Sequence, residues 1–234
     1  MHSECQSAER PPDHIVRAAT AKDHQLLATL DLIASEEPLG RSFWLDLLEG
    51  IDTPVEEFLK AVFDANASAW GQTEDFLLIE CRGQVAAGCA VFKPTRDASI
   101  GPLNLDRLGE VSRQLGWSAE AKQRFETAYR EVWTGDLDFL KPQADAIIET
   151  VAVLPEFRGH GFGNALMEAA KSKASALGAG SLGVMVIHGN NAAQCLYDQH
   201  FERYTTYHPE YFNGEFPGIT KYRTAVNTKE SNDG

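Results

Sequence analysis

The chain has 234 residues, of which 43% are hydrophobic and 24% are charged, so it suits one globular α/β domain with an elaboration, or two small domains. Its net charge of −13 argues against a nucleic-acid partner, because contacts with phosphates need a basic face. No apolar run approaches the roughly 18 residues of a membrane span and the polar N-terminus is unlike a signal peptide, so we expect no membrane partner.

The N-terminal part is predicted to form a strand and helices before a β-hairpin. The sequence Thr53-Pro54-Val55-Glu56 is typical of a capping box, and the apolar residues after it follow helical spacing. The predicted elements are a disordered lead-in (1–13), a strand (14–18), helices beginning near Thr20, Ser42 and Thr53, and hairpin strands at 76–81 and 85–92.

In the C-terminal part, two helical patterns at 95–140 are inserted between predicted strands. This insertion has three open interpretations: a lid, the contact of a homodimer, or added core. The remaining predicted elements are a strand (141–153), a helix from Asn164 to Gly178, a strand (182–187), a helix opening at Asn190, strands near 201–207 and 219–225, and a flexible tail (226–234). This order predicts one α/β domain over 14–225, with a mixed sheet flanked by helices and a helical insertion between the third and fourth strands.

The four cysteines, Cys5, Cys81, Cys89 and Cys195, have no metal-ligand spacing. We therefore expect no metal site. Free thiols are the expected state, as in a reducing compartment, and they favour a cytoplasmic location.

A glycine-rich loop joins an apolar strand end to a helix. Gly159, Gly161 and Gly163 recur at every second position, so no Cβ blocks the backbone N–H groups between them. These groups and the positive end of the helix dipole predict an anion site, to which Arg158 can add a charged fork. The spacing fits neither a Walker loop nor a dinucleotide fingerprint. The structural alternative is an ordinary strand-to-helix turn.

Two motifs resemble the GNAT-type N-acetyltransferase family. The first, V-x-P-x-x-R-G-x-G-x-G/A, is matched by Val153, Pro155, Arg158, Gly159, Gly161 and Gly163. The second, N-x-x-A-x-x-L-Y, is matched by Asn190, Ala193, Leu196 and Tyr197, although the family's glycine before Phe201 is missing.

The resemblance implies a GNAT-like sheet in which the strands on either side of the loop-helix unit splay apart. It implies acetyl-CoA as co-substrate, a small-molecule or peptide amine as acceptor, and a ternary complex. The residues implied in binding acetyl-CoA are Val151, Val153, Arg158, Gly159, His160, Gly161, Phe162, Gly163, Asn164, Asn190 and Tyr197.

Tyr197 resembles the general acid of the family, a phenol near the thioester sulfur. The alternative is a packed helix tyrosine whose hydroxyl bonds a backbone carbonyl. The oxyanion donor would be a backbone N–H on the strand of Val151 and Val153.

Glu149 is the expected general base. Strand alternation puts it on one face with Ile147, Val151 and Val153. Desolvation among apolar neighbours would raise its pKa towards neutrality, as a base acting on an ammonium requires. A glutamate that is paired with an arginine or faces solvent is the alternative. His188 is the second candidate for the base, and loss of the proton through water is a third route.

A catalytically silent acyl-CoA-binding module is the competing function, since it would use the same loop. Only an enzyme needs Tyr197 and Glu149, so their presence favours N-acetyltransferase activity. The acceptor site is less defined, because the aromatic residues of 207–212 could line a pocket or pack their own loop.

Overall fold

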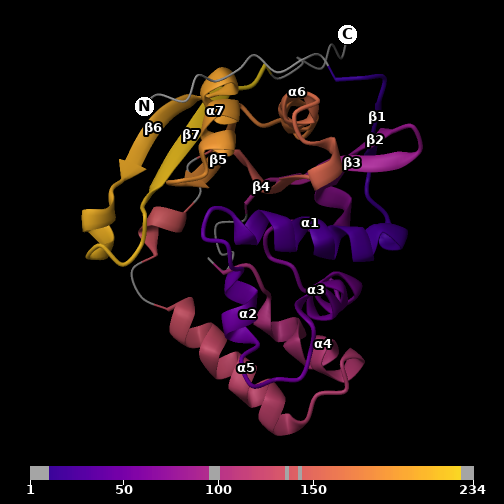
Figure 1. Ribbon diagram of the computed structural model, residues 1–234, viewed down its shortest axis with the longest axis vertical. Coiled ribbons are helices and arrows are strands. Elements are labelled where there is room, and N and C mark those ends of the chain that lie inside the picture. Colours follow the sequence, from indigo (N-terminus) through magenta and orange to yellow (C-terminus); the bar gives the residue numbers. More distant parts are fainter. Residues whose placement is uncertain (1–10, 95–100, 135–136, 142–143, 228–234) are drawn as a thin grey trace.

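A computed structural model of the chain describes residues 11–94, 101–134, 137–141 and 144–227 (Figure 1). Most of the predicted lead-in and tail, and part of the insertion, therefore lie outside the described residues.

The strands form one mixed sheet in the order β1-β2-β3-β4-β5-β7-β6. Every neighbouring pair is antiparallel except β4 and β5, which are parallel. The strands are β1 (Ile15–Ala18), β2 (Phe76–Cys81), β3 (Gln84–Phe92), β4 (Ala146–Val153), β5 (Ser181–Ile187), β6 (Glu202–Tyr207) and β7 (Ile219–Ala225). The predicted mixed sheet is confirmed.

Helices cover both faces of this sheet (Figure 1). Helices α6 and α7 pack on one face with Leu166, Met167 and Tyr197, and α1 packs on the other with Leu27 and Leu30. The helices are α1 (His24–Glu36), α2 (Phe43–Leu47), α3 (Val55–Asp64), α4 (Leu108–Gln114), α5 (Ala119–Val132), α6 (Phe162–Ala176) and α7 (Asn191–His200). The element order agrees with the prediction.

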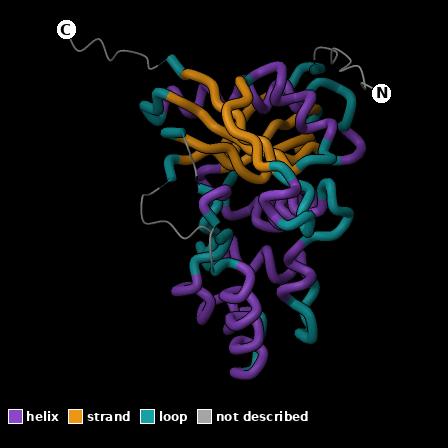
Figure 2. Tube along the Cα trace, turned by 90° about the vertical axis from the view of Figure 1, so that its left-hand side faces the viewer, coloured by secondary structure: helices purple, strands orange, loops and turns teal. Residues whose placement is uncertain are grey.

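The insertion between β3 and β4 builds a second hydrophobic core. Phe125 and Tyr129 of α5 and Val111 of α4 are buried together with Trp44 of α2 and Phe58 of α3. This helical half, made of α2, α3, α4 and α5, lies beyond α1 (Figure 1) and extends away from the sheet (Figure 2). Of the three interpretations of the insertion, these contacts support added core.

The capping box predicted at Thr53 is wrong. The N-cap of α3 is Pro54, and no side chain caps this helix. The Thr53 hydroxyl instead accepts a hydrogen bond of 2.8 Å from Trp117 Nε1, at the turn between α4 and α5. A tertiary contact with the insertion has therefore taken the oxygen that the local pattern assigns to the cap. The caps expected at Thr20 and Ser42 are confirmed.

The expectation of free thiols holds for Cys81 and Cys89, which are free and buried. It is wrong for Cys195, which is disulfide-bonded. Disulfides persist in oxidising compartments, so the thiols give no support to a cytoplasmic location.

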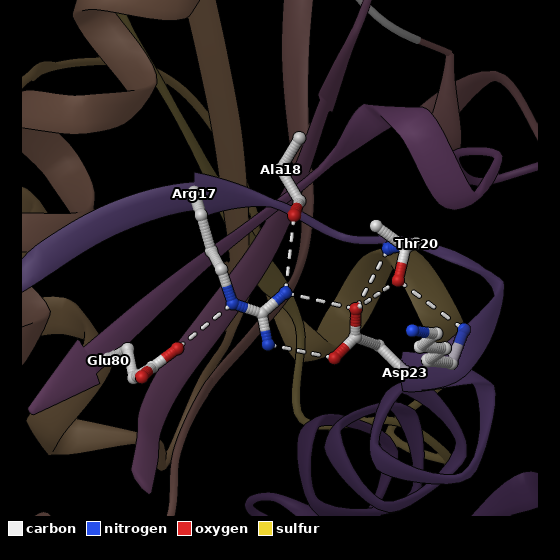
Figure 3. A network of polar contacts seen from close by, with 6 residues as sticks. Arg17, Ala18, Thr20, Asp23 and Glu80 are labelled. Atoms are coloured by element: carbon white, nitrogen blue, oxygen red, sulfur yellow. Dashed lines mark hydrogen bonds and ion pairs between the residues drawn. The ribbon is translucent and has the colours of Figure 1, made fainter. Parts of the chain in front are cut away.

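A half-buried ion-pair network fastens the edge strand β1 (Figure 3). Arg17 donates to both carboxylate oxygens of Asp23, at 2.8 and 3.0 Å, and to Glu80 of β2 at 3.1 Å. Asp23 also accepts from the backbone N–H of Thr20 at 2.8 Å. The hydrogen bonds from Arg17 lower the pKa of Asp23 to about 2. One arginine thus ties β1 to its neighbour and to the start of α1.

Replacing Asp23 by Asn is expected to lower the free energy of unfolding at pH 7 by about 1–2 kcal/mol, because charge-assisted hydrogen bonds are lost. A lowered pKa means that the ionised carboxylate stabilises the fold above about pH 4 and that this contribution disappears as the pH falls to about 2. Urea unfolding of both proteins at pH 7 and pH 2.5 measures the difference, which should shrink at the lower pH. Asp46, whose ion pair with Arg41 is exposed, is the control, and Asp46→Asn should change little. An equal loss in both variants would contradict the assignment.

Candidate active site

The parallel strands β4 and β5 separate after a short paired segment. Only Ala146 with Leu182 and Ile147 with Gly183 are paired, although β4 continues to Val153. The strands therefore open a gap in the sheet immediately before the glycine loop, as the predicted splay requires.

A β-bulge lies on β4 inside this gap. Thr150 has a φ of 54°, which is unusual for a β-branched residue, and the register against β3 shifts between Gly88 and Ala90. The extra residue reverses the alternation of side chains. Val151 and Val153 pack with the α6 side of the sheet, whereas Ala152 packs on the α1 side.

The expectation that Glu149 shares a face with Val151 and Val153 is therefore wrong. Ile148 packs with the same α6-side cluster as Val151 and Val153, so Glu149 lies on the opposite face, towards α1. The bulge also leaves a backbone N–H outside the regular ladder of hydrogen bonds. Such a group can donate to an oxyanion in the gap.

The glycine loop has the backbone geometry of an anion site. Gly159 and Gly161 have φ angles of 81° and 80°, in the region that glycine tolerates. A Cβ on Gly159 would meet no atom within 4 Å, so the space beside it is open. Gly161 is the N-cap of α6, which begins at Phe162, two residues earlier than predicted. The first N–H groups of α6 have no partner within the helix and are available to an anion.

Three of the predicted cofactor-binding residues, Phe162, Gly163 and Asn164, serve contacts within the protein. A Cβ on Gly163 would lie 3.1 Å from Leu196, so this glycine allows α6 to approach α7. The Phe162 ring is buried in the core, and Asn164 Oδ1 lies 2.9 Å from His200 Nε2. Only the backbone of these residues is left for an anion.

Arg158 and His160 are exposed beside the loop. Arg158 Nε donates to the Val153 carbonyl at 3.3 Å, which holds the guanidinium against the end of β4. Asn190 caps α7, since its Oδ1 accepts from Ala193 N at 3.0 Å. Its amide N–H₂ remains as a donor near the gap.

Tyr197 is buried on α7, with its ring edge-on to Phe201 and Tyr222. Burial, followed by the nearby Cys89, Glu149 and Tyr222, raises the pKa of Tyr197 above its usual value. Within the described residues no hydrogen bond is found for its hydroxyl, so the carbonyl partner weighed above is not seen there. The phenol stays protonated at neutral pH.

Glu149 is partly buried next to a second acid that the sequence did not reveal. Burial and the Asp31 carboxylate of α1 raise the pKa of Glu149 to about 8. Burial likewise raises the pKa of Asp31 to about 6. The available signal was the spacing, because Asp31 follows the buried Leu27 by four residues and so lies on the buried side of α1.

A small cavity of about 30 Å³ lies against Glu149, where β4 and β5 begin to separate. It is lined by Ile147 and Glu149 of β4, Gly183 and Met185 of β5, Tyr204, Lys221 and the end of the insertion. Lys221 is buried and donates to the Lys141 carbonyl at 2.7 Å.

His188 lies just beyond β5, where its Nε2 is 2.9 Å from the Thr220 hydroxyl. The aromatic residues of the β6–β7 connection pack against one another and against Phe139 of the insertion, with ring centroids 4.9 to 6.4 Å apart. These contacts favour packing of the loop over a pocket lined by its rings.

No helix in the described ranges combines the length and apolar character needed to cross a bilayer. Nor does the described part of the chain contain a cluster of His, Cys, Asp or Glu side chains suited to a metal ion.

A splayed parallel strand pair, followed by a glycine loop at a helix N-terminus, defines the fold of the acetyltransferases. Residues 42–201 match the family model described as the acetyltransferase (GNAT) family. The chain belongs to this family, whose members use acetyl-CoA and transfer acetyl groups to amines. At this level of description it is an N-acetyltransferase.

Solved structures share the fold at low sequence identity. An acetyltransferase crystal structure aligns with a TM-score of 0.57 and 20% identity, over 91% of this chain and 100% of its own. An N-acetyltransferase from Staphylococcus aureus Mu50 aligns with a TM-score of 0.54 and 18% identity, over 91% and 100%. No curated protein sequence matches the chain.

Proposed function

We propose that the chain transfers the acetyl group of acetyl-CoA to a primary amine, of a small molecule or a peptide, within a ternary complex. The observation that carries this proposal is the pairing of Glu149, with a pKa of about 8, and a protonated Tyr197 around one gap in the sheet. General acid–base catalysis needs one group that accepts a proton and one that donates a proton, and above about pH 8 an ionised Glu149 and a protonated Tyr197 would supply them.

The residues around the gap fit acetyl-CoA. The open backbone at Gly159, the positive φ of Gly161 and the first turn of α6 would hold the pyrophosphate, with Arg158 beside it. The gap between β4 and β5 would admit the pantetheine arm, and Asn190 would donate to one of its amides. When bound, acetyl-CoA supplies the acetyl group as an activated thioester.

The chain's own groups would then move the protons. Glu149 takes a proton from the ammonium of the acceptor, so that the nitrogen can bond to the acetyl carbon. A backbone N–H of the β4 bulge donates to the carbonyl oxygen as charge develops on it. Tyr197 gives its proton to the sulfur as the carbon–sulfur bond breaks. In all, the acceptor nitrogen loses two protons, the first to Glu149 and the second as the amide forms. The thiol gains one proton from Tyr197, so the reaction releases one proton to solvent.

The test is to incubate the protein with acetyl-CoA and each of a panel of amines, and to measure the release of free thiol. An enzyme should release thiol with at least one class of primary amine. Binding of coenzyme A by calorimetry with no thiol release from any amine would instead support the silent acyl-CoA-binding module.

Replacing Tyr197 by Phe is expected to lower turnover at least about tenfold, because the leaving thiolate would lack its proton donor. Affinity for coenzyme A should change little, since one hydroxyl is removed and the ring stays. Tyr222→Phe is the control, because it removes a hydroxyl from the ring next to Tyr197. That hydroxyl donates to Asp198 at 3.1 Å and has no part in the proposed reaction. Wild-type turnover in Tyr197→Phe would make Tyr197 a packing residue.

A further inference from the structure

Asp31 lies where the helical half of the molecule meets the strand bulge. It accepts a hydrogen bond of 2.8 Å from Nε1 of Trp44 on α2, and the Thr150 side chain on β4 is its second polar neighbour, which lowers the pKa of Asp31. Trp44 is itself buried in the second core, with Phe58 at 5.4 Å between ring centroids. One carboxylate thus connects α1, α2 and β4.

The residue that Asp31 holds on β4 is the one with the unusual backbone. Thr150 is a β-branched residue with a φ of 54°, and such conformations persist only where surrounding contacts fix them. Its hydroxyl is the only polar group of its side chain, so the contact with Asp31 fixes that side chain's direction. Glu149 directly precedes Thr150 on the strand, and the register shift of the bulge lies at this step.

We propose that Asp31 is a positioning residue, which fastens the β4 bulge to the helical half and thereby fixes Glu149 and the bulge amide relative to the acceptor. This role rests on the acetyl transfer proposed above. Asp31 is not the base, because its carboxylate already has two polar partners, Trp44 and Thr150.

The same placement gives Asp31 an electrostatic effect on Glu149. The ionisable groups around Glu149 are Asp31 of α1, Tyr197 of α7, and Lys141, Tyr204 and Lys221, which line the cavity beside it. Of these groups, the Asp31 carboxylate raises the pKa of Glu149, in addition to the effect of burial. Removing that charge should let Glu149 ionise at lower pH.

Two variants separate the charge from the attachment. Asp31→Asn keeps an oxygen for Trp44 and Thr150 but removes the charge, so the rising limb of kcat/KM against pH should move down by about 1 unit. Thr150→Val keeps the branched shape and the Asp31 charge but cuts the attachment. It should lower kcat by about tenfold or more with little change in KM, because the bulge amide is misplaced.

Asp46→Asn is the control, since this aspartate of α2 is exposed and pairs only with Arg41. It should leave kcat and the pH profile unchanged. Unchanged kcat, KM and pH profile in both Asp31→Asn and Thr150→Val would overturn the proposal. An equal fall in kcat in Asp31→Asn and Asp46→Asn would also overturn the proposal.

A measurement without substrate distinguishes failure of this proposal from failure of the proposed function. The ¹³C carboxyl resonance of Glu149, assigned by its loss in Glu149→Gln, reports the titration directly. Its midpoint should fall by about 1 unit in Asp31→Asn even if no amine is ever acetylated. An unmoved midpoint would overturn the role of Asp31, whatever the activity.

Discussion

The Gly161→Val variant is expected to lose detectable binding of coenzyme A. Gly161 is the N-cap of α6 with a φ of 80°, a conformation that a β-branched residue rarely adopts. A valine there would distort the turn that presents the first N–H groups of α6 and fill the space that a pyrophosphate needs. Titration calorimetry with coenzyme A measures the loss.

Gly178→Val is the matched control for the backbone strain. Gly178 follows the same helix at its other end, with a φ of 64°, and a Cβ there would meet no atom within 4 Å. The control should lose a similar amount of thermal stability but keep its affinity. If Gly161→Val is folded and binds coenzyme A as the wild type does, the loop is structural and the proposed binding site is wrong.

The Glu149→Gln variant is expected to lose activity by about a hundredfold or more near pH 8, because glutamine keeps the shape of the side chain but cannot accept the proton. In the wild type the rate should rise with pH and level off above about 8, as the Glu149 carboxyl ionises. In the variant this limb should vanish or move up towards the ionisation of the amine itself. Steady-state rates from pH 6 to pH 10 measure both effects.

Glu80→Gln is the control, since Glu80 is a strand glutamate whose partner is Arg17 on β1. Its pH–rate profile should match that of the wild type. An unchanged profile in Glu149→Gln would exclude Glu149 as the base. His188→Ala would then separate the histidine from a route through water.

The stability of the two proteins should also diverge with pH. Because the folded state raises the pKa of Glu149 to about 8, the fold binds this proton more tightly than the unfolded chain does. The wild type should therefore lose stability between about pH 4.5 and pH 8, because over this range the unfolded chain releases the proton while the folded protein still holds it. The Gln variant lacks this loss, so it should have the higher melting temperature at pH 8.

Local patterns predicted the elements whose cause is itself local. The hairpin turn lies between the two predicted strands, at Arg82 and Gly83, and both residues have positive φ. The glycine loop and the capping of α7 by Asn190 likewise follow from motifs contained within one strand–helix unit. Such features need no knowledge of distant residues.

The bulge and its support could not be predicted, because their causes are distant in the sequence. No local signal marks Thr150 for a positive φ. Its partner Asp31 lies on α1, and helices α2 to α5 come between the two residues in the sequence. The regular alternation assigned to β4 failed for this reason. The prediction of Thr53 as a cap failed for a similar reason, because the Thr53 hydroxyl accepts a hydrogen bond from the distant Trp117 of the insertion.

The second core has a consequence for spectroscopy. All four tryptophans of the chain, Trp44, Trp70, Trp117 and Trp133, belong to its aromatic contacts, and none lies on the sheet. Intrinsic fluorescence will therefore follow the melting of the helical half, whereas far-ultraviolet circular dichroism also follows the sheet. Coinciding transitions by the two probes would mean that both halves unfold as one cooperative unit, and an earlier change in fluorescence would mean that the helical half melts first.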